Sequence, residues 1–320
     1  MQKKKVLISY RLLDEGLEDL REQFDVTMPE SGSFSKDELI RLLPDHDALL
    51  SIFTLGVDKE LIDAGGDRLK VISNYAVGFN NIDIDYARQK GIAVCNTPDP
   101  VIEPTAELAY ALMGCAARRL AEDDRKLRIP GLLKWGTFEN LGVGMFGKTL
   151  GVIGMGRIGQ AIARRALAGG MKVVYFNRHR LDAETERKYE ATYLTKEDLL
   201  RQSDFICVST PLTKETHHLI DAQALSMMKP TAIIVNTARG AVIDELALTD
   251  ALRNHRIKGA ALDVFEHEPV ITDALYELDN VVLSPHCGTG TIDARIAMAR
   301  FASQNIINFF SGSGRVCRVV

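Results

Sequence analysis

The sequence lacks the features that mark membrane-spanning, disulfide-rich and nucleic-acid-binding proteins. Its longest apolar run, residues 108–117, is about half as long as the ~20 apolar residues that a bilayer-spanning helix needs. The five cysteines have no C-x-x-C pair and no metal-ligand spacing, which predicts free thiols in a reducing cytoplasm. The formal net charge is −4, so no basic field attracts nucleic acid. We therefore expect a cytoplasmic protein with no membrane, nucleic-acid or metal partner.

The apolar residues fall into short runs that alternate with amphipathic stretches along all 320 residues. Such runs are typical of strands in parallel sheets, and the amphipathic stretches are typical of the helices that connect them. A chain of this length is long for one domain and comfortable for two. The sequence therefore predicts an α/β protein with two doubly wound parallel-sheet domains.

Two successive series of strands and helices define the predicted domains. In the first series we expect helices at 12–24 and 35–43, and strands at 5–10, 25–28, 47–51, 69–76 and 92–98. In the second series we expect strands at 149–153, 172–176, 205–209, 232–236, 259–263 and 281–284. The connecting helices have recognisable N-terminal caps, such as the capping-box pattern TKED at 195–198. The predicted domains comprise residues 1–98 with 287–320, and residues 99–286.

Two longer helices are predicted beside these series. Residues 104–126 are expected to form one helix whose first turns are apolar on nearly every face. A helix of this kind must be covered on all sides, which predicts packing between the domains or against a second subunit, and hence a homodimer. Residues 291–310 are expected to form the last helix and to fold back onto the first domain.

A glycine-rich turn, GMGRIG, joins a buried strand to a helix at the start of the second series. Gly154 permits the tight turn, Gly156 lets the backbone approach a pyrophosphate, and Gly159 allows the helix and strand to pack closely. The helix N-terminus, with Arg157 and Ile158 in its first turn, then faces the anion. The strand before and the helix after favour a dinucleotide site over a simple tight turn.

The next strand ends in FNRHR, where a dinucleotide-binding fold usually carries an acid that holds the adenosine ribose. Asn177 at this place does not repel a 2′-phosphate, and Arg178 and Arg180 can donate charge-assisted hydrogen bonds to one. We therefore expect NADP(H) to be preferred, with NAD(H) possible. The alternative is a solvated loop whose charges have no ligand.

Polar residues follow three further strands of the second series. Arg239 comes after AIIVNTA, Asp263 and Glu268 come after GAAL, and His286 comes after VVLSP. Because ligands bind at the carboxyl ends of strands in open α/β sheets, we expect these residues to converge. Taken singly, the histidine could be structural, and Arg239 with Glu268 could form an ordinary interdomain ion pair.

The motifs GMGRIG, NTARG, LDVFEHEP and SPH, in this order, resemble those of the D-isomer-specific 2-hydroxyacid dehydrogenase family. The resemblance covers essentially the whole chain and includes YAVGFNNIDI and NTP near its start. The stretch LTKETHHLI and the FNRHR cluster further resemble the NADPH-linked glyoxylate/hydroxypyruvate/2-ketogluconate reductase branch. The resemblance implies a Rossmann cofactor domain and a smaller flavodoxin-like substrate domain formed by the two chain ends.

The resemblance implies that the protein reduces a small 2-keto acid to the D-2-hydroxy acid. His286 is then the proton donor, since histidine titrates near neutral pH, and Glu268 holds the imidazole and favours its protonated form. Arg239 offers a planar fork to the substrate carboxylate and carbonyl. Asp263 matches the position that orients the nicotinamide. Domain closure around the substrate would exclude water before the reaction.

The resemblance also implies further contacts. Backbone N–H groups at Val77 and Gly78 join Arg239 and His286 in the substrate site. The implied cofactor contacts beyond the glycine turn and the FNRHR cluster are Thr210, Pro211, Thr216, Thr237, Ala238, Arg239, Asp263, His286 and Gly288. After the histidine the chain reads HCGTGT, where relatives more often have an aliphatic residue and Gly-Ser-Ala-Thr. Cys287 and Gly290 therefore leave details of the nicotinamide pocket open.

Other functions fit the sequence less well. An NAD-linked 2-hydroxyacid dehydrogenase of another substrate range is one alternative. Phosphoglycerate dehydrogenase is disfavoured because the ribose acid is absent, and formate dehydrogenase because Glu268 stands where that enzyme typically has glutamine. A dinucleotide-sensing transcriptional corepressor would keep the same triad, but no disordered tail or partner-binding extension is evident.

Overall fold

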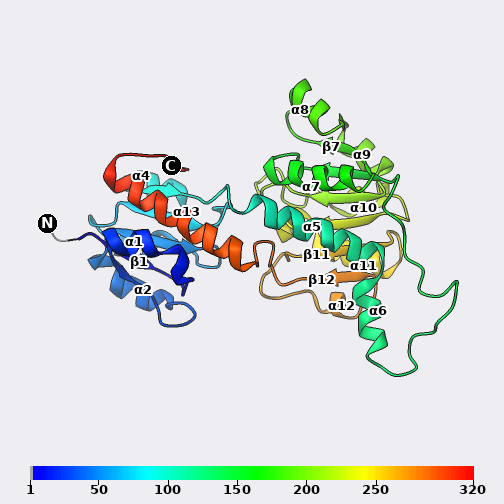
Figure 1. The fold of residues 1–320 in the computed structure, drawn as a ribbon, viewed down its shortest axis with the longest axis horizontal. Helices are drawn as coiled ribbons and strands as arrows, with labels where there is room; N and C mark the ends of the chain where they lie inside the picture. Colours follow the sequence, from blue (N-terminus) through cyan, green and yellow to red (C-terminus); the bar gives the residue numbers. More distant parts are fainter. Residues whose placement is uncertain (1–2) are drawn as a thin grey trace. The chain divides into compact units, whose positions relative to one another are not determined.

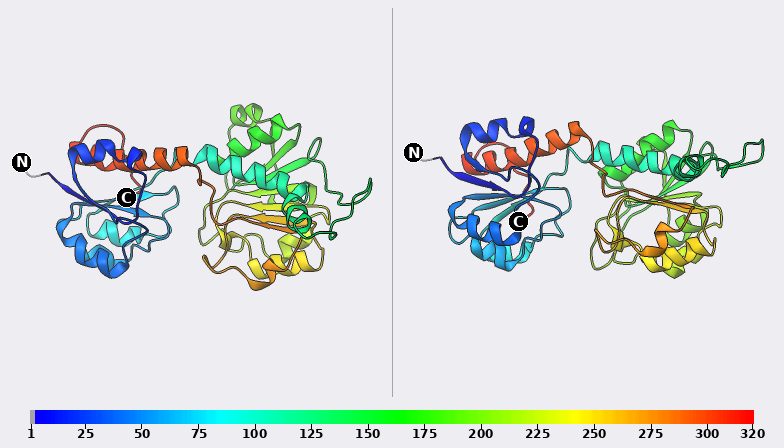
Figure 2. Two further views of the ribbon diagram at one scale, coloured as in Figure 1. Left: turned by 60° about the horizontal axis from the view of Figure 1, so that its bottom comes forward. Right: turned by 90° about the horizontal axis from the view of Figure 1, so that it is seen from below.

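The computed structural model describes residues 3–320 and divides them into two compact units. One unit comprises Met1–Pro104 with Thr289–Val320, and the other comprises Thr105–Gly288. Each unit is built on a parallel sheet with helices on both faces, as Figures 1 and 2 show. The predicted α/β class with two doubly wound parallel sheets is confirmed.

The first unit has a five-stranded sheet in the order β2-β1-β3-β4-β5, with every pair parallel. Its strands are β1 (Lys5–Ile8), β2 (Asp25–Thr27), β3 (Ala48–Ile52), β4 (Val71–Tyr75) and β5 (Ala93–Cys95). This order is that of flavodoxin-like folds. All five predicted strands are present, and each observed strand is shorter than or as long as its predicted run.

Helices cover both faces of this sheet (Figure 2). They are η1 (Asp14–Gly16), α1 (Glu18–Gln23), α2 (Lys36–Leu42), η2 (Leu43–Asp45), α3 (Lys59–Ala64), α4 (Ile84–Gln89) and α13 (Ile292–Ser311). The predicted helix at 12–24 is interrupted, since a short 3-10 turn precedes α1. Ser35 and Glu38 form a complete capping box at the start of α2.

The C-terminal helix α13 packs on β4 and beside α1, as predicted for a last helix that returns to the first domain. Ser73 donates a hydrogen bond to the Ala302 carbonyl at 2.9 Å. A Cβ at Gly16 would lie 2.4 Å from the Cβ of Ala299, so only glycine allows this close contact between η1 and α13. Residues from the two ends of the chain therefore share one core.

The second unit has a seven-stranded parallel sheet in the order β12-β11-β10-β9-β6-β7-β8. Its strands are β6 (Thr149–Ile153), β7 (Lys172–Phe176), β8 (Ala191–Tyr193), β9 (Phe205–Val208), β10 (Ile233–Asn236), β11 (Gly259–Leu262) and β12 (Val281–Leu283). The order places β6 beside both β7 and β9, the switch point of a Rossmann fold. Six strands match the predicted ones, whereas the short edge strand β8 was not predicted.

The helices of this unit lie on both faces of its sheet (Figure 2). They are α5 (Ile102–Ala117), α6 (Leu120–Leu127), α7 (Arg157–Ala168), α8 (Ala183–Lys188), α9 (Lys196–Gln202), α10 (Ala222–Met227), η3 (Gly240–Val242), α11 (Glu245–Arg253) and α12 (Asp273–Tyr276). At the start of α9, Thr195 accepts the backbone N–H of Asp198, which is one half of the predicted capping box. No helix within residues 3–320 has both the length and the apolar character needed to cross a membrane.

The prediction of one helix over residues 104–126 is wrong. Helix α5 ends at Ala117, and Arg119 has a left-handed backbone with φ of 56° before α6 begins. The Ala117 carbonyl accepts the N–H of Val143 at 2.8 Å, so a later segment takes a bond that a continuous helix would have made. The break turns α6 away from the axis of α5 (Figure 1).

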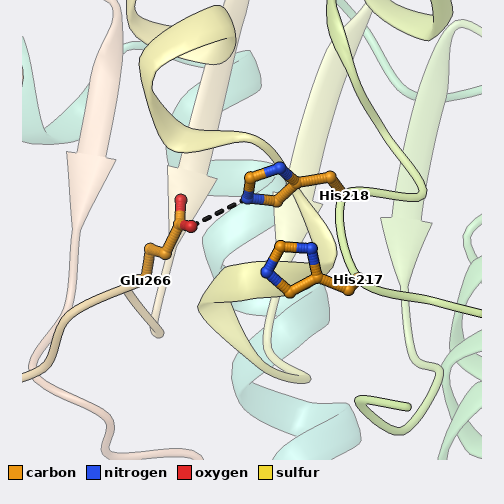
Figure 3. Close-up of side chains that lie close together, drawn as sticks. All are labelled: His217, His218 and Glu266. Atoms are coloured by element: carbon orange, nitrogen blue, oxygen red, sulfur yellow. Dashed lines mark hydrogen bonds and ion pairs between the residues drawn. The ribbon is translucent and has the colours of Figure 1, made fainter. Parts of the chain in front are cut away.

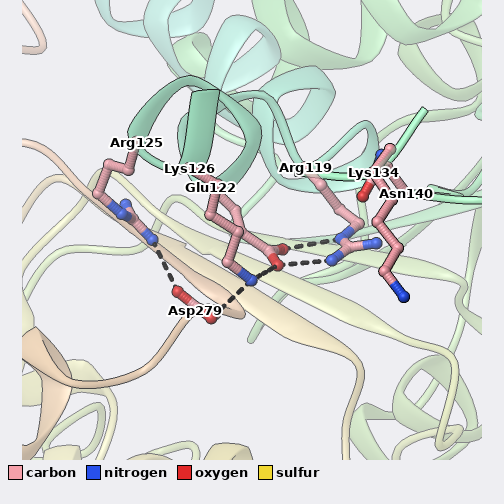
Figure 4. Close-up of polar contacts among 7 residues, drawn as sticks. All are labelled: Arg119, Glu122, Arg125, Lys126, Lys134, Asn140 and Asp279. Carbon is pink, nitrogen blue, oxygen red and sulfur yellow. Dashed lines mark hydrogen bonds and ion pairs between the residues drawn. The ribbon is translucent and has the colours of Figure 1, made fainter. Parts of the chain in front are cut away.

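Ion pairs hold α6 in this direction (Figure 4). The nearly buried carboxylate of Glu122 accepts hydrogen bonds from Arg119 at 2.7 Å and Lys126 at 2.6 Å. The hydrogen bond from Arg119, aided by Lys126, lowers the pKa of Glu122 to about 2 against the effect of burial. Arg125 and Lys126 also pair with Asp279, which precedes β12. Charged contacts that are distant in sequence thus favour two helices over one.

Candidate active site

The glycine turn follows β6 and leads into α7, as the sequence predicts. Gly154 has φ of +97°, and a Cβ there would lie 2.6 Å from the Ser209 carbonyl carbon at the end of β9. A Cβ at Gly159 would lie 2.3 Å from the Gly154 oxygen. By contrast, a Cβ at Gly156, the N-cap of α7, would meet no atom within 4 Å. Two glycines are thus required by close packing, while Gly156 leaves open space at a helix N-terminus, where Arg157 is exposed.

Asn177 contributes to the glycine turn itself. Its side-chain oxygen accepts the backbone N–H of Met155 at 2.6 Å, and its carbonyl accepts the Tyr193 hydroxyl at 3.3 Å. From the sequence, Asn177 was expected only to permit a 2′-phosphate, and this hydrogen bond was not predicted. Asparagine can replace an acid here because its amide oxygen accepts a backbone N–H without a negative charge.

The two arginines of the FNRHR cluster have different surroundings. Arg180 forms a two-pronged pair with Glu186, with both N···O distances 2.8 Å. Glu186 also accepts the Tyr175 hydroxyl at 2.6 Å, and the pair with Arg180 chiefly lowers the pKa of Glu186 to about 2. Arg178 is exposed and has no ion pair within residues 3–320. One guanidinium is therefore held in place and the other is available to an anion.

The loop after β9 carries the predicted cofactor residues Thr210, Pro211 and Thr216. The Thr216 hydroxyl donates to the Pro211 carbonyl at 2.6 Å and accepts the Thr213 N–H at 2.7 Å. These bonds close the loop into a tight turn. A Cβ at Gly154 would come within 2.8 Å of the Thr210 nitrogen, so this loop begins directly beside the glycine turn.

The end of β10 presents Thr237, Ala238 and Arg239 in a fixed conformation. The buried Asn236 side chain accepts the Ala238 N–H and donates to the Arg239 carbonyl, both at 3.0 Å. Arg239 donates to the Ala238 carbonyl at 2.7 Å, and burial lowers the pKa of its guanidinium while Glu268 opposes that shift. The hydroxyl oxygen of Thr237 is buried and has no hydrogen-bond partner within residues 3–320.

Gly240 explains how Arg239 and Glu268 come near one another. A Cβ at this position would lie 1.9 Å from the carbonyl carbon of Phe265. Only glycine therefore lets the backbone after β10 press against the backbone after β11. Glu268 follows in the same segment, and its Oε1 accepts the Phe265 N–H at 3.0 Å.

Asp263 organises the loop that carries His286. Its buried carboxylate accepts the Ser284 hydroxyl at 2.6 Å, the Cys287 N–H at 2.9 Å and the Gly288 N–H at 2.8 Å. Its backbone carbonyl accepts the His286 N–H at 2.8 Å. These four bonds hold His286 at a left-handed φ of 50°, a conformation that costs energy in a non-glycine residue and is concentrated at functional sites.

His286 and Glu268 form a pair. The Nδ1 atom of His286 and the Oε2 atom of Glu268 lie 2.6 Å apart. Burial alone would raise the pKa of Glu268. The pKa is nevertheless below its usual value, because the hydrogen bond from His286, the charges of His286 and Arg239 and the hydrogen bond from the Phe265 N–H together outweigh burial. Glu268 is therefore ionised near neutral pH and accepts the hydrogen bond from Nδ1 of His286.

In the first unit, the predicted carboxylate ligands Val77 and Gly78 follow β4. The Asn96 side chain donates to the Val77 carbonyl and the Asn74 side chain donates to the Gly78 carbonyl, both at 2.8 Å. Within residues 3–320 neither the Val77 N–H nor the Gly78 N–H has an acceptor. Backbone N–H groups that have no acceptor and are held in a fixed conformation can bind an anion. The roles of Asn74, Asn96, Asn236 and Ser284 in holding these backbone segments were not predicted from the sequence.

The residues of the second unit fit a nicotinamide dinucleotide. The open space over Gly156 lies at the N-terminus of α7, where a pyrophosphate is favoured by the helix dipole. The unpaired hydroxyl of Thr237 lies at the carboxyl end of the neighbouring strands and offers a hydrogen bond to a bound group. Backbone donors, a helix terminus and a buried orphan hydroxyl are the features that such a ligand needs.

Known proteins resemble the chain over nearly its whole length. Residues 110–288 match the model of the D-isomer specific 2-hydroxyacid dehydrogenase NAD binding domain. A glyoxylate reductase of Thermococcus onnurineus is 44% identical over 315 residues, which are 97% of this chain and 94% of that protein.

Solved structures agree. A protein of Thermus thermophilus is 38% identical with a TM-score of 0.91, covering 99% of this chain and 100% of that one. An NADPH-dependent glyoxylate/hydroxypyruvate reductase of Sinorhizobium meliloti, solved with NADP and malonate, is 30% identical with a TM-score of 0.88. The match covers 100% of this chain and 97% of that one. The chain is therefore an NAD(P)-dependent enzyme that belongs to the D-isomer-specific 2-hydroxyacid dehydrogenase family.

Proposed function

We propose that the protein reduces a small 2-keto acid, of the glyoxylate, hydroxypyruvate or 2-ketogluconate type, to the D-2-hydroxy acid with NADPH. The pair of His286 with the ionised Glu268, held in a strained loop near the half-buried Arg239, is the observation that carries this proposal. The names of the Thermococcus and Sinorhizobium relatives support the substrate class.

His286 acts as the proton donor in this mechanism. A nicotinamide, when bound, would provide the hydride that reduces the carbonyl carbon of the substrate. Because Nδ1 of His286 is engaged with Glu268, the proton that neutralises the carbonyl oxygen comes from Nε2. Glu268 fixes the ring orientation and stabilises the charged imidazole, and Asp263 fixes the loop. In the reverse direction neutral His286 takes the proton of the 2-hydroxyl group.

Arg239 binds the substrate carboxylate and polarises the carbonyl. Its planar guanidinium can form two parallel hydrogen bonds, and its partial burial reduces the competition from water. We propose the Val77 and Gly78 N–H groups as further carboxylate ligands, since their carbonyls are fixed and their N–H groups unused. On this proposal residues 1–98 with 287–320 form the substrate domain and residues 99–286 the cofactor domain.

The proposed preference for NADPH rests on the FNRHR cluster. No carboxylate stands at position 177 to repel a 2′-phosphate, Arg178 is exposed and unpaired within residues 3–320, and Arg180 is held by Glu186. Gly154, Gly156, Arg157, Ile158 and Gly159 are proposed to bind the pyrophosphate. The other predicted cofactor contacts, also proposed here, are Thr210, Pro211, Thr216, Thr237, Ala238, Arg239, Asp263, His286 and Gly288.

A direct assay tests the function. We expect the purified protein to oxidise NADPH when glyoxylate or hydroxypyruvate is added, with slower oxidation of NADH. The absorbance of the reduced cofactor measures both rates. Tight dinucleotide binding without turnover on glyoxylate, hydroxypyruvate or 2-ketogluconate would instead support the corepressor-like alternative.

Replacement of Glu268 by glutamine is expected to change the pH dependence of reduction. Because the pKa of Glu268 is lowered, the wild-type residue is charged throughout the neutral range, and the variant loses that charge while keeping a hydrogen-bond partner. The protonated imidazole is then less favoured. The falling limb of the rate at high pH should move to lower pH by about one unit. An unmoved profile would show that Glu268 does not act on His286.

We also propose that the protein is a homodimer. The segment around and after α6 exposes aromatic side chains to solvent, with Trp135 87%, Phe138 85% and Phe146 85% exposed. Several large apolar side chains exposed in one segment indicate an interaction surface. A second copy of the chain could cover this surface in a symmetric dimer. Light scattering should give about twice the 35.4 kDa mass of the chain. A monomer mass at micromolar concentration would exclude the dimer.

A further inference from the structure

Three side chains outside the proposed catalytic machinery come together on the second unit. His217 and His218 lie on the loop after β9, and Glu266 lies 48 residues beyond His218 on the loop after β11. Figure 3 shows both imidazoles beside the carboxylate of Glu266. One ligand atom from each of the three residues lies within 4.8 Å of the others.

The contacts within this cluster bring three potential metal ligands together. The Nε2 atom of His218 lies 2.8 Å from Oε1 of Glu266. The two imidazole rings are stacked, with centroids 4.0 Å apart and an interplanar angle of 29°. The ring of His217 has no hydrogen bond within residues 3–320. An ordinary ion pair needs only His218 and Glu266. The imidazole of His217 is an additional potential ligand within 4.8 Å of both.

Two of the three ligands are held by neighbouring groups. The backbone of His218 has a left-handed φ of 50°, and its N–H donates to the Ala241 carbonyl at 2.8 Å. The Glu266 carboxylate accepts the Glu245 N–H at 3.4 Å, and the Glu266 N–H donates to the Glu245 carboxylate at 2.8 Å. Such supporting hydrogen bonds orient ligands at metal sites. His217 is exposed and can adjust to an ion.

We propose that His217, His218 and Glu266 bind one first-row transition-metal ion such as Zn²⁺. Two imidazole nitrogens and one carboxylate oxygen suit this class, whereas Ca²⁺ and Mg²⁺ prefer oxygen ligands only. Water would complete a four-coordinate site. The ion would join the loop after β9 to the loop after β11 and stabilise the folded chain by binding it selectively. This inference is independent of the proposed reaction and of its cofactor.

Calorimetric titration of the full-length, tag-free, EDTA-treated protein with Zn²⁺ tests the site. We expect one ion per chain. His217→Ala should weaken binding by at least about tenfold, and Glu266→Gln should do the same, because each removes one ligand. The melting temperature should rise with Zn²⁺ in the wild type and not in His217→Ala. His255→Asn, which changes an exposed histidine elsewhere in the same unit, is the control and should bind as the wild type does.

Two outcomes would overturn the proposal. One is the absence of saturable Zn²⁺ binding by the wild-type protein. The other is unchanged binding by His217→Ala, which would place the ion elsewhere, for example at the His286–Glu268 pair. Co²⁺ substitution gives a readout besides affinity: the site proposed here has no thiolate, so a sulfur-to-cobalt absorption band would assign the ion to a cysteine instead.

Discussion

Replacement of His286 by alanine is expected to lower the turnover of reduction by about 10²–10⁴-fold at low to neutral pH, the usual contribution of a general acid. The residual rate of the variant should not follow the fall of the wild-type rate at high pH, because the variant has no group at this place that gains or loses a proton. Binding of NADPH, measured by the fluorescence of the cofactor, should change little, since the glycine turn and the loop after β9 are untouched.

Backbone strain must be separated from proton transfer in this experiment. His286 has φ of 50°, so a substitution also changes the energy of a strained backbone. His286→Asn is the matched variant, because asparagine tolerates the left-handed region but cannot donate as an acid. His255→Asn, at a histidine with φ of 51°, controls for the same change away from the site. Wild-type turnover in His286→Asn would contradict the assignment of His286 as the proton donor.

The second large effect is expected at the adenosine end of the cofactor. Replacing Arg178 and Arg180 together by alanine should raise the KM for NADPH and reduce the preference for NADPH over NADH at least about tenfold, because charge-assisted hydrogen bonds to the 2′-phosphate are lost. The kinetics with NADH should barely change, since NADH carries no 2′-phosphate. Steady-state kinetics with both cofactors measures the ratio.

The pair between Arg180 and Glu186 requires a control of its own. In the double variant, Glu186 loses its partner, and an unpaired carboxylate could itself repel the phosphate. Glu186→Gln removes that carboxylate while leaving both arginines, and should leave the KM for NADPH unchanged or lower it. The single variant Arg178→Ala tests the exposed guanidinium alone. A wild-type enzyme that already prefers NADH would refute the proposed phosphate site.

Local patterns in the sequence were sufficient to predict most strands of the two sheets and the glycine turn. The six predicted strands of the second unit are short apolar runs, and such runs form strands because both faces of a parallel sheet are buried. The glycine at 159 is required by contacts of the helix α7 with Val152 and Gly154, in the strand and turn that directly precede it. Because these contacts are local, spacing alone indicates them, whereas the close contact of Gly154 is with Ser209 after β9. The family likewise followed from the order of the motifs and is confirmed by its relatives.

The unpredicted features depend on residues far apart in the chain. Strand β8 has three residues at the edge of the sheet, too few for a periodic pattern. The break between α5 and α6 is set by Val143 and Asp279, while the local sequence there favours one helix. The amide of Asn177 holds the glycine turn through a bond that spans 22 residues.

The supports of the candidate site and the histidine cluster were decided by the tertiary structure alone. Asp263 closes the His286 loop across 21 to 25 residues, and Glu266 reaches His218 across 48. Neither separation along the sequence corresponds to the repeat of a helix or strand. Such pairs arise because the carboxyl ends of adjacent parallel strands meet at one edge, whatever the length of the connections between them. The sequence determined which residues stand at those ends, and the order of strands in the sheet decided which of them meet.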